Sequence, residues 1–165
     1  MRTFPDPFFR RWTRRSVSWT LVVLGFLLLL ALSPLWIAGC GLLDLILRGR
    51  IASLRGMVFV ISYLYYEIVG MTLCLWVWLR YGRNPKTFHD QMFPAQFYWG
   101  RHLAESAIRV LGLRIHIESD YVFSRRRIIL AARHTSIADT LVPMVYVCIP
   151  HNLRLGYVMK RELEW

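Results

Sequence analysis

The run SVSWTLVVLGFLLLLALSPLWIAGCGLL (Ser16–Leu43) contains no charged residue. Roughly 20 apolar residues span a bilayer as a helix, so this run is long enough to cross one, and Pro34 is expected to end or kink the helix near its far side. A second apolar run covers Met57–Leu79 and is interrupted only by Glu67. The two runs together predict a transmembrane or membrane-embedded helical hairpin near the N-terminus.

Glu67 falls near the middle of the second run, where an ionised carboxylate is costly. Such a residue can mark an intramembrane functional site. It can also be a protonated or hydrogen-bonded carboxyl group that faces the other helix, with Tyr63 one turn away and Ser62 nearby as partners. We favour the second interpretation.

Arginine side chains resist translocation, and they flank both apolar runs. We therefore expect both ends of the hairpin to face the cytoplasm, with the protein in the cytoplasmic (inner) membrane. The connecting segment is basic as well, with Arg48, Arg50 and Arg55. Because this segment is charged, a hairpin that lies shallowly in one leaflet, without crossing the membrane, is the alternative.

The whole chain has 165 residues, of which 56% are hydrophobic and 19% are charged. A soluble domain has about 45–50% apolar and about 25% charged residues, so this composition excludes an ordinary soluble domain. The net charge of +11 suits nucleic acid or anionic lipid. The apolar content favours lipid, and no aromatic and basic nucleic-acid module is recognisable. Three widely separated cysteines predict neither a disulfide framework nor a metal site.

The chain divides into four predicted parts: a basic segment (1–16), the hairpin (17–80), a turn-rich linker (81–96) and an α/β segment (97–165). The α/β segment begins with a predicted amphipathic helix that Gly112 ends. The alternation of strand and helix predicts a parallel crossover unit. Its expected elements are a helix over Phe97–Leu111, a strand over Leu113–Glu118, a strand over Ile128–Ala132, a helix over Leu141–Ile149 and a strand over Leu153–Met159.

His134 and Asp139 stand between the second predicted strand and the following helix, where ligands bind in open α/β sheets. A neutral imidazole can remove a proton from a hydroxyl group, and a carboxylate can fix its tautomer and stabilise the imidazolium. The alternative for Asp139 is structural, because Ser136 and Asp139 have the spacing of a helix capping box. On spacing alone the structural alternative is the stronger one.

In its context, Arg133–Asp139 resembles the His-x4-Asp motif of the glycerolipid acyltransferases, especially those of the 1-acyl-sn-glycerol-3-phosphate type. Leu113–Ile117 is similar to the strand that precedes this motif, and Tyr157–Leu163 is similar to the Lys-x-Glu-Leu stretch that follows it. The likeness covers about Phe97–Trp165. Two departures stand out: Arg133 occupies a position where many members have Asn, and the later motif Phe-Pro-Glu-Gly-Thr-Arg does not occur.

The resemblance implies acyl transfer from acyl-CoA or acyl carrier protein to the free hydroxyl of lysophosphatidate or a similar lysophospholipid, as in phospholipid biosynthesis. It makes His134 the general base and Asp139 the residue that orients and charges the imidazole, with no metal or bound cofactor. Because the later motif is missing, we expect a truncated catalytic domain that is inactive alone. The alternative is a noncatalytic, membrane-anchored module that binds lipid or protein. The residues expected to contact the substrate are Arg133, Thr135, Ser136, Lys160 and Glu162.

Overall fold

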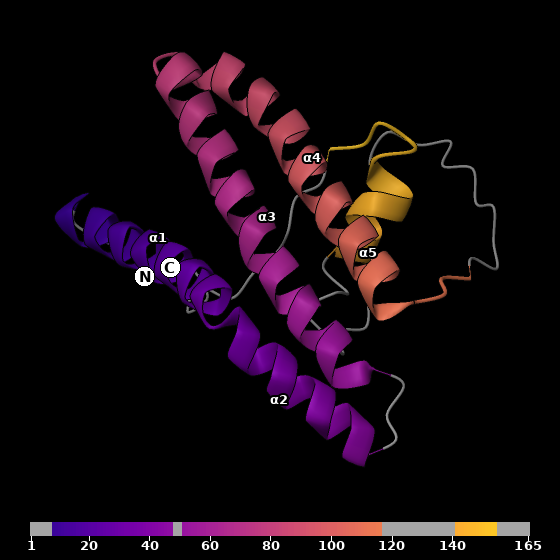
Figure 1. The fold of residues 1–165 in the computed structure, drawn as a ribbon. Coiled ribbons are helices and arrows are strands. Elements are labelled where there is room, and N and C mark those ends of the chain that lie inside the picture. Colours follow the sequence, from indigo (N-terminus) through magenta and orange to yellow (C-terminus); the bar gives the residue numbers. More distant parts are fainter. Residues whose placement is uncertain (1–7, 48–50, 117–140, 155–165) are drawn as a thin grey trace, which may run out of the picture.

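The computed structural model describes residues 8–47, 51–116 and 141–154. These residues form helices, and no strand occurs among them. The elements are α1 (Phe8–Ala31), α2 (Ser33–Ile46), α3 (Ala52–Tyr81), α4 (Pro85–Leu111), the short α5 (Leu141–Pro143) and the π-helical turn η2 (Met144–Cys148) (Figure 1).

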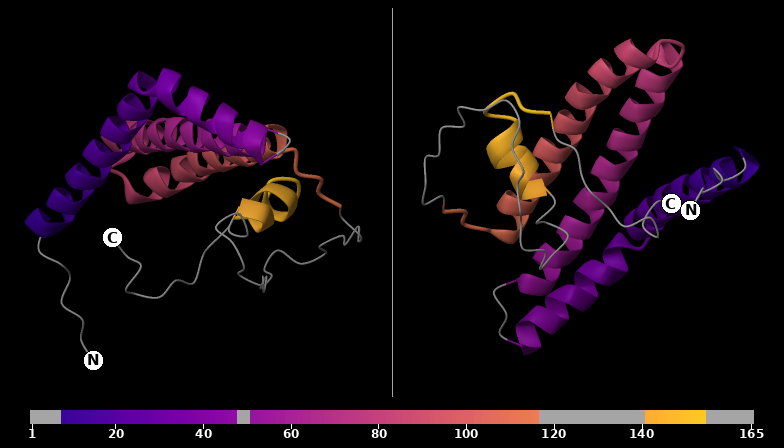
Figure 2. Two further views of the ribbon diagram at one scale, coloured as in Figure 1. Left: turned by 60° about the horizontal axis from the view of Figure 1, so that its bottom comes forward. Right: turned by 180° about the vertical axis from the view of Figure 1, so that it is seen from behind.

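The helices are arranged in layers around α3 and α4, which pack side by side and antiparallel (Figure 1). The helices α1 and α2 contact α3, whereas α5 and η2 contact α4. Seen from another direction, α1 and α2 lie on one side of the α3–α4 pair and the C-terminal helical turns lie on the other (Figure 2). The α3–α4 pair therefore separates two different surroundings.

The long apolar run predicted as the first helix is broken where a break was expected, next to Pro34. The helix α1 ends at Ala31, and α2 begins at Ser33 with a proline in its first turn. At the bend, the indole Nε1 of Trp36 donates a hydrogen bond to the carbonyl oxygen of Leu29, at 2.8 Å. This side-chain bond satisfies a carbonyl group at the end of α1.

The start of α3 is held by a residue of α2. Ile51, at the N-cap position of α3, has a φ of 51° and no side-chain capping bond. Instead, the buried carboxylate of Asp44 accepts hydrogen bonds from the amides of Ser53 (2.9 Å) and Leu54 (3.1 Å). Burial alone would raise the pKa of Asp44, but these hydrogen bonds, with one from the Ser53 hydroxyl, lower it below the ordinary value.

The predicted linker over 81–96 is helical from Pro85 onward, so that prediction is wrong for most of its length. Asn84 is the N-cap of α4: its Oδ1 accepts hydrogen bonds from the amides of Lys86 (3.1 Å) and Thr87 (3.3 Å). Pro85 occupies the first helical turn, where its missing N–H costs nothing. At the other end the prediction is confirmed, because Gly112 closes α4 with a φ of 68°.

The predicted α/β fold is wrong, because the described residues form an all-α arrangement. The strand expected over Leu113–Glu118 is irregular and exposed as far as His116. Its alternating pattern would indicate a strand only if one face were buried. Of the strand expected over Leu153–Met159, the first two residues are irregular as well, and the strand over Ile128–Ala132 lies outside the described residues. The helix expected from Leu141 is present, as α5 and η2.

Candidate functional site

The helix α1 meets α3 near its own C-terminal end and diverges from it toward its N-terminal end (Figures 1 and 2). Phe26 and Tyr65 form the contact near the close end, with ring centroids 6.3 Å apart. At the diverging end, Trp12 and Trp78 bridge the two helices edge to face, with ring centroids 5.9 Å apart. Two aromatic pairs thus frame the space between α1 and α3.

Between α1 and α3 lies a groove of about 800 Å³, and α4 forms the floor of this groove. Each helix contributes a stripe of side chains at intervals of three and four residues, which places each stripe on one helical face. The stripe of α3 runs from Glu67 to Trp78, which corresponds to about 16 Å along the helix axis. The lining residues of α1 are Trp12, Arg15, Ser16, Trp19 and Thr20, and those of α4 are Phe88, Met92, Ala95, Gln96 and Trp99.

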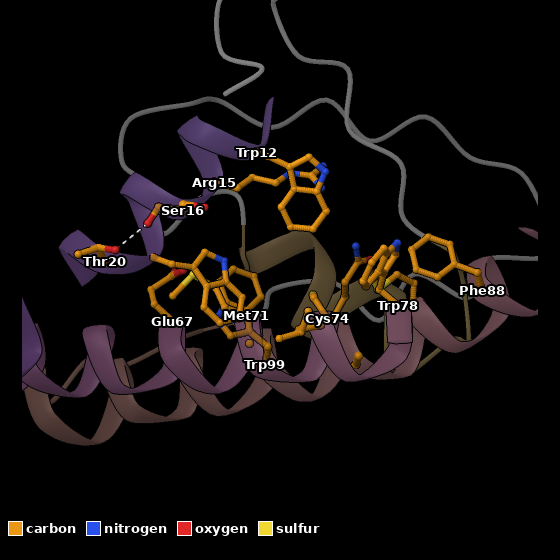
Figure 3. Close-up of a pocket in the computed structure, with 16 residues that line it drawn as sticks. Trp12, Arg15, Ser16, Thr20, Glu67, Met71, Cys74, Trp78, Phe88 and Trp99 are labelled. Carbon is orange, nitrogen blue, oxygen red and sulfur yellow. Dashed lines mark hydrogen bonds between the residues drawn. The ribbon is translucent and has the colours of Figure 1, made fainter. Parts of the chain in front are cut away.

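Most of the groove is apolar and aromatic, since four of the seven tryptophans of the chain line it. Figure 3 shows Arg15 extending along α1 toward Trp12, while Glu67 and Met71 lie at the opposite part of the groove. Arg15 is the cation and Glu67 the acid among the described lining residues. No ion pair joins them, and neither forms an ion pair with another described residue. Among the described residues, the groove thus combines an apolar body with one positive charge that forms no ion pair.

The interpretation of Glu67 as a partnered carboxyl group is supported by its surroundings. The hydroxyl of Tyr63, one turn earlier on α3, lies beside the Glu67 carboxyl group. Ser62, the other candidate partner, instead donates its hydroxyl to the carbonyl oxygen of Val58 (2.9 Å). Glu67 also lines the groove.

Trp99 shapes the floor of the groove by packing against Gly70 of α3. A Cβ atom at Gly70 would collide with Cδ1 of Trp99 and lie 2.9 Å from its Cγ. Only a glycine allows the indole ring to lie this close to the helix. The Nε1 atom of Trp99 is buried and has no hydrogen-bond partner among the described residues. Such a donor is unusual, because buried polar groups are nearly always paired.

The residues predicted as catalytic and substrate-binding lie outside the described residues, so the structure places none of them. Along the chain, five of them precede α5 (Leu141–Pro143) and two follow η2. The predicted residues concerned are His134, Asp139, Arg133, Thr135, Ser136, Lys160 and Glu162.

Sequence reasoning missed the groove, although its three stripes are visible as helical periodicity. The stripe at 12, 15, 16, 19 and 20 is divided between the expected basic segment (1–16) and the expected hairpin (17–80), and that of α4 begins inside the expected linker. A tryptophan in each of the three stripes was the signal that could have singled them out. No known protein family model, curated protein or solved structure matches the chain.

Proposed function

We propose that this protein is a membrane-bound acyltransferase that acts on lysophosphatidate or a similar lysophospholipid. The observation that carries the proposal is the sequence Arg133–Asp139, which has the His-x4-Asp arrangement directly ahead of an apolar helix. The apolar helices support the same proposal, because the acceptor lipid resides in a membrane. By length and composition, two helices can cross one, over Trp12–Ala31 and Ala52–Tyr81.

In the proposed reaction His134 removes the proton from the acceptor hydroxyl, and Asp139 holds the imidazole and stabilises its charged form. The hydroxyl oxygen attacks the thioester carbonyl of acyl-CoA or acyl carrier protein. The carbon–sulfur bond breaks, the new ester forms, and the thiolate leaves with the proton that His134 returns. The charged residues Arg133 and Lys160 would attract the phosphate of either substrate.

The packing of α4 on α3 bears on how the protein meets the membrane. Gly70 contacts Trp99, and the Tyr66 and His102 rings are 6.2 Å apart, so Arg101 of α4 lies beside the middle of α3. Arg101 also forms an exposed ion pair with Glu105, at 2.8 Å. Charged groups in the hydrocarbon core are costly. We therefore infer that the α3–α4 pair lies along the membrane surface, with α4 toward water.

The opposite side of the pair has the chemistry of a lipid-facing surface. The outer faces of α1 and α2 expose large aliphatic side chains, and a membrane would bury them. Among them are Leu21, Leu24, Leu27, Leu28, Leu35, Leu42, Leu45 and Ile46. This arrangement corresponds to a hairpin that lies shallowly in one leaflet, the alternative that the basic connecting segment allows. It keeps the arginines of α3 and α4 on the cytoplasmic side.

The test measures transfer of a labelled acyl group to lysophosphatidate by membranes that contain the complete natural protein with these residues. Acyl-CoA and acyl carrier protein are compared as donors. We expect His134→Ala to lower the rate about 10²–10⁴-fold, the usual contribution of a general base. The protein should remain in the membrane fraction, because its apolar helices are unchanged.

His116→Ala is the matched control, because His116 is an exposed histidine in the described residues and has no proposed role. Its activity should equal that of the unmodified protein. Near-normal activity of His134→Ala would remove the histidine from its role as base. Complete absence of acyl transfer by the unmodified protein would favour the noncatalytic lipid-binding alternative.

A further inference from the structure

The turn between α3 and α4 carries three cations, and none of them forms an ion pair with a described residue (Figure 1). We call these exposed side chains the basic turn: Arg80, Arg83 and Lys86. No aspartate or glutamate occurs over residues 68–89. The next acid along α4 is Asp90, and it already pairs with Arg154, at 2.7 Å. The basic turn is therefore a concentrated positive charge on the described surface.

Helix stabilisation accounts for only part of this charge. The chain between the two helices is held by the amide of Asn84, which donates to the carbonyl oxygen of Tyr81 at 3.0 Å. Arg80 lies in the last turn of α3, where the helix dipole favours a cation. Lys86 lies in the first turn of α4, where the helix dipole disfavours one. In the protein alone the basic turn thus repels itself, and a nearby negative charge would relieve this repulsion.

Aromatic and apolar side chains surround the basic turn. The Tyr81 ring contacts that of Trp76, with centroids 6.2 Å apart, and the guanidinium carbon of Arg80 lies 5.6 Å from the Tyr81 ring centroid. The side chains of Trp76, Trp78 and Leu79 are 57%, 47% and 68% exposed. Indole and phenol rings gather at the head-group level of membranes, where one part of the ring is in apolar surroundings and the other is hydrated. This combination fits a boundary between lipid and water, whereas a nucleic acid would leave Leu79 in water.

We propose that the basic turn binds the head groups of anionic phospholipids in the bilayer that holds the protein. Its three cations meet the lipid phosphates, while Trp76 and Leu79 enter the head-group region. Charge complementarity selects the partner, because a surface of anionic lipid attracts lysine and arginine and a zwitterionic surface does not.

This inference goes beyond the proposed function and does not depend on acyl transfer. The apolar faces of the helices would hold the protein in any bilayer, whereas the basic turn distinguishes lipids by their charge. The inference also holds for either orientation of the α3–α4 pair. A turn at the end of the pair lies at a membrane surface whether the pair runs along the membrane or crosses it.

The test measures which lipids lie next to the full chain in vesicles of phosphatidylcholine. Part of the lipid is replaced by brominated phosphatidylglycerol or, at the same mole fraction, by brominated phosphatidylcholine, and each quenches the fluorescence of nearby tryptophans. We expect phosphatidylglycerol to be preferred about fivefold, the effect of one cation near an anionic surface. The preference should disappear at about 1 M salt, where the Debye length is about 3 Å.

Three sets of variants locate the preference. Replacing all three cations of the basic turn should make the two brominated lipids quench equally: Arg80→Gln, Arg83→Gln and Lys86→Gln. The matched control loses the same charge from exposed arginines nearer the other end of α4, and it should keep the preference: Arg101→Gln, Arg109→Gln and Arg114→Gln. Trp76→Phe removes the indole beside the basic turn and should lower the extra quenching by phosphatidylglycerol.

Equal quenching by the two brominated lipids around the unmodified protein would overturn the proposal. A preference that the control variant loses as fully as the basic-turn variant would assign it to net charge and overturn the role of the turn. Tighter binding of single-stranded RNA than of phosphatidylglycerol, lost with the three cations, would overturn the choice of lipid. Circular dichroism checks that the helices persist. If the triple variant does not fold, Arg83→Gln alone should lower the preference in part, and an unchanged preference would contradict the proposal.

Discussion

The helices α3 and α4 are nearly equal in length, at 30 and 27 residues, and lie side by side, yet their chemistry differs. In α3 the charged residues are Arg55, Glu67 and Arg80, of which only Glu67 lies away from the ends. Charged residues stand in both halves of α4, at Lys86, Asp90, Arg101, Glu105 and Arg109, and Arg101 and Glu105 form an ion pair. A boundary between lipid and water that crossed both helices would put charges into hydrocarbon. The comparison supports the proposal that the boundary runs along the pair.

The largest expected effect concerns the two ends of α4. Gln91 and Arg109 are 18 residues apart, or about 27 Å along the helix, which is close to the hydrocarbon thickness of about 30 Å. If the pair lies along the surface, Gln91→Cys and Arg109→Cys react with a membrane-impermeant maleimide from the same side of sealed vesicles. The measurement is maleimide labelling of each single-cysteine protein, added outside or inside.

Leu24→Cys on α1 is the control for burial in lipid. Leu24 is 59% exposed in the protein alone, so a membrane is what would keep this cysteine from reacting. Labelling of the two α4 positions from opposite sides would show instead that the pair crosses the membrane.

The next effect concerns the contact that holds the two helices together. Gly70→Ala pushes Trp99 away from α3, and overpacking of this kind costs about 1–3 kcal/mol. Gly56→Ala, on the same helix, meets nothing within 4 Å and should leave the stability unchanged or raise it by up to about 1 kcal/mol. Thermal unfolding of both variants in detergent measures the difference. Equal melting temperatures would mean that Trp99 does not rest on Gly70.

The smallest effect concerns how each helix begins. Asn84 caps α4 locally, and Asn84→Ala should cost about 1 kcal/mol at every pH. Asp44 caps α3 from another helix, and its pKa is lowered in the folded protein. Its stabilisation is therefore complete above the ordinary pKa of 3.8 and is lost as the pH falls through the lower, folded-state value.

Asp44→Asn should abolish this acid dependence, whereas Asn84→Ala should retain it. The measurement is the melting temperature in detergent between neutral and strongly acidic pH. The same acid loss in Asp44→Asn as in the unmodified protein would assign that loss to other carboxyl groups.

Most of the helices could be predicted from the sequence. The residues at which they begin and end were harder to predict, because a proline can indicate either a turn or the first turn of a helix. Asn84-Pro85 indicates a turn and also a helix start, because asparagine caps and proline fits the first turn. Pro94 falls in the predicted linker, yet it lies inside α4. Packing of α4 against α3 offsets the cost of the backbone hydrogen bond that Pro94 cannot form. The pattern of a single sequence does not show which helices pack together.

The groove could not have been predicted in the same way. Periodicity shows which face of α1 carries Trp12, Arg15 and Trp19, but not the angle at which that face meets α3. Likewise the alternation at Leu113–His116 indicated a strand, although these residues are exposed in the structure. Alternation predicts a strand only together with a neighbouring strand, which is a property of the tertiary structure.

The hydrogen bond from Trp36 to the Leu29 carbonyl has a consequence for how this protein can diversify. It lies at the bend between α1 and α2, away from the groove lining, and the direction of α1 beyond the bend sets how far α1 diverges from α3. A substitution at Trp36 that removes the donor would alter the aperture of the groove without changing any residue that lines it. The width of the groove can therefore change through a single residue outside it.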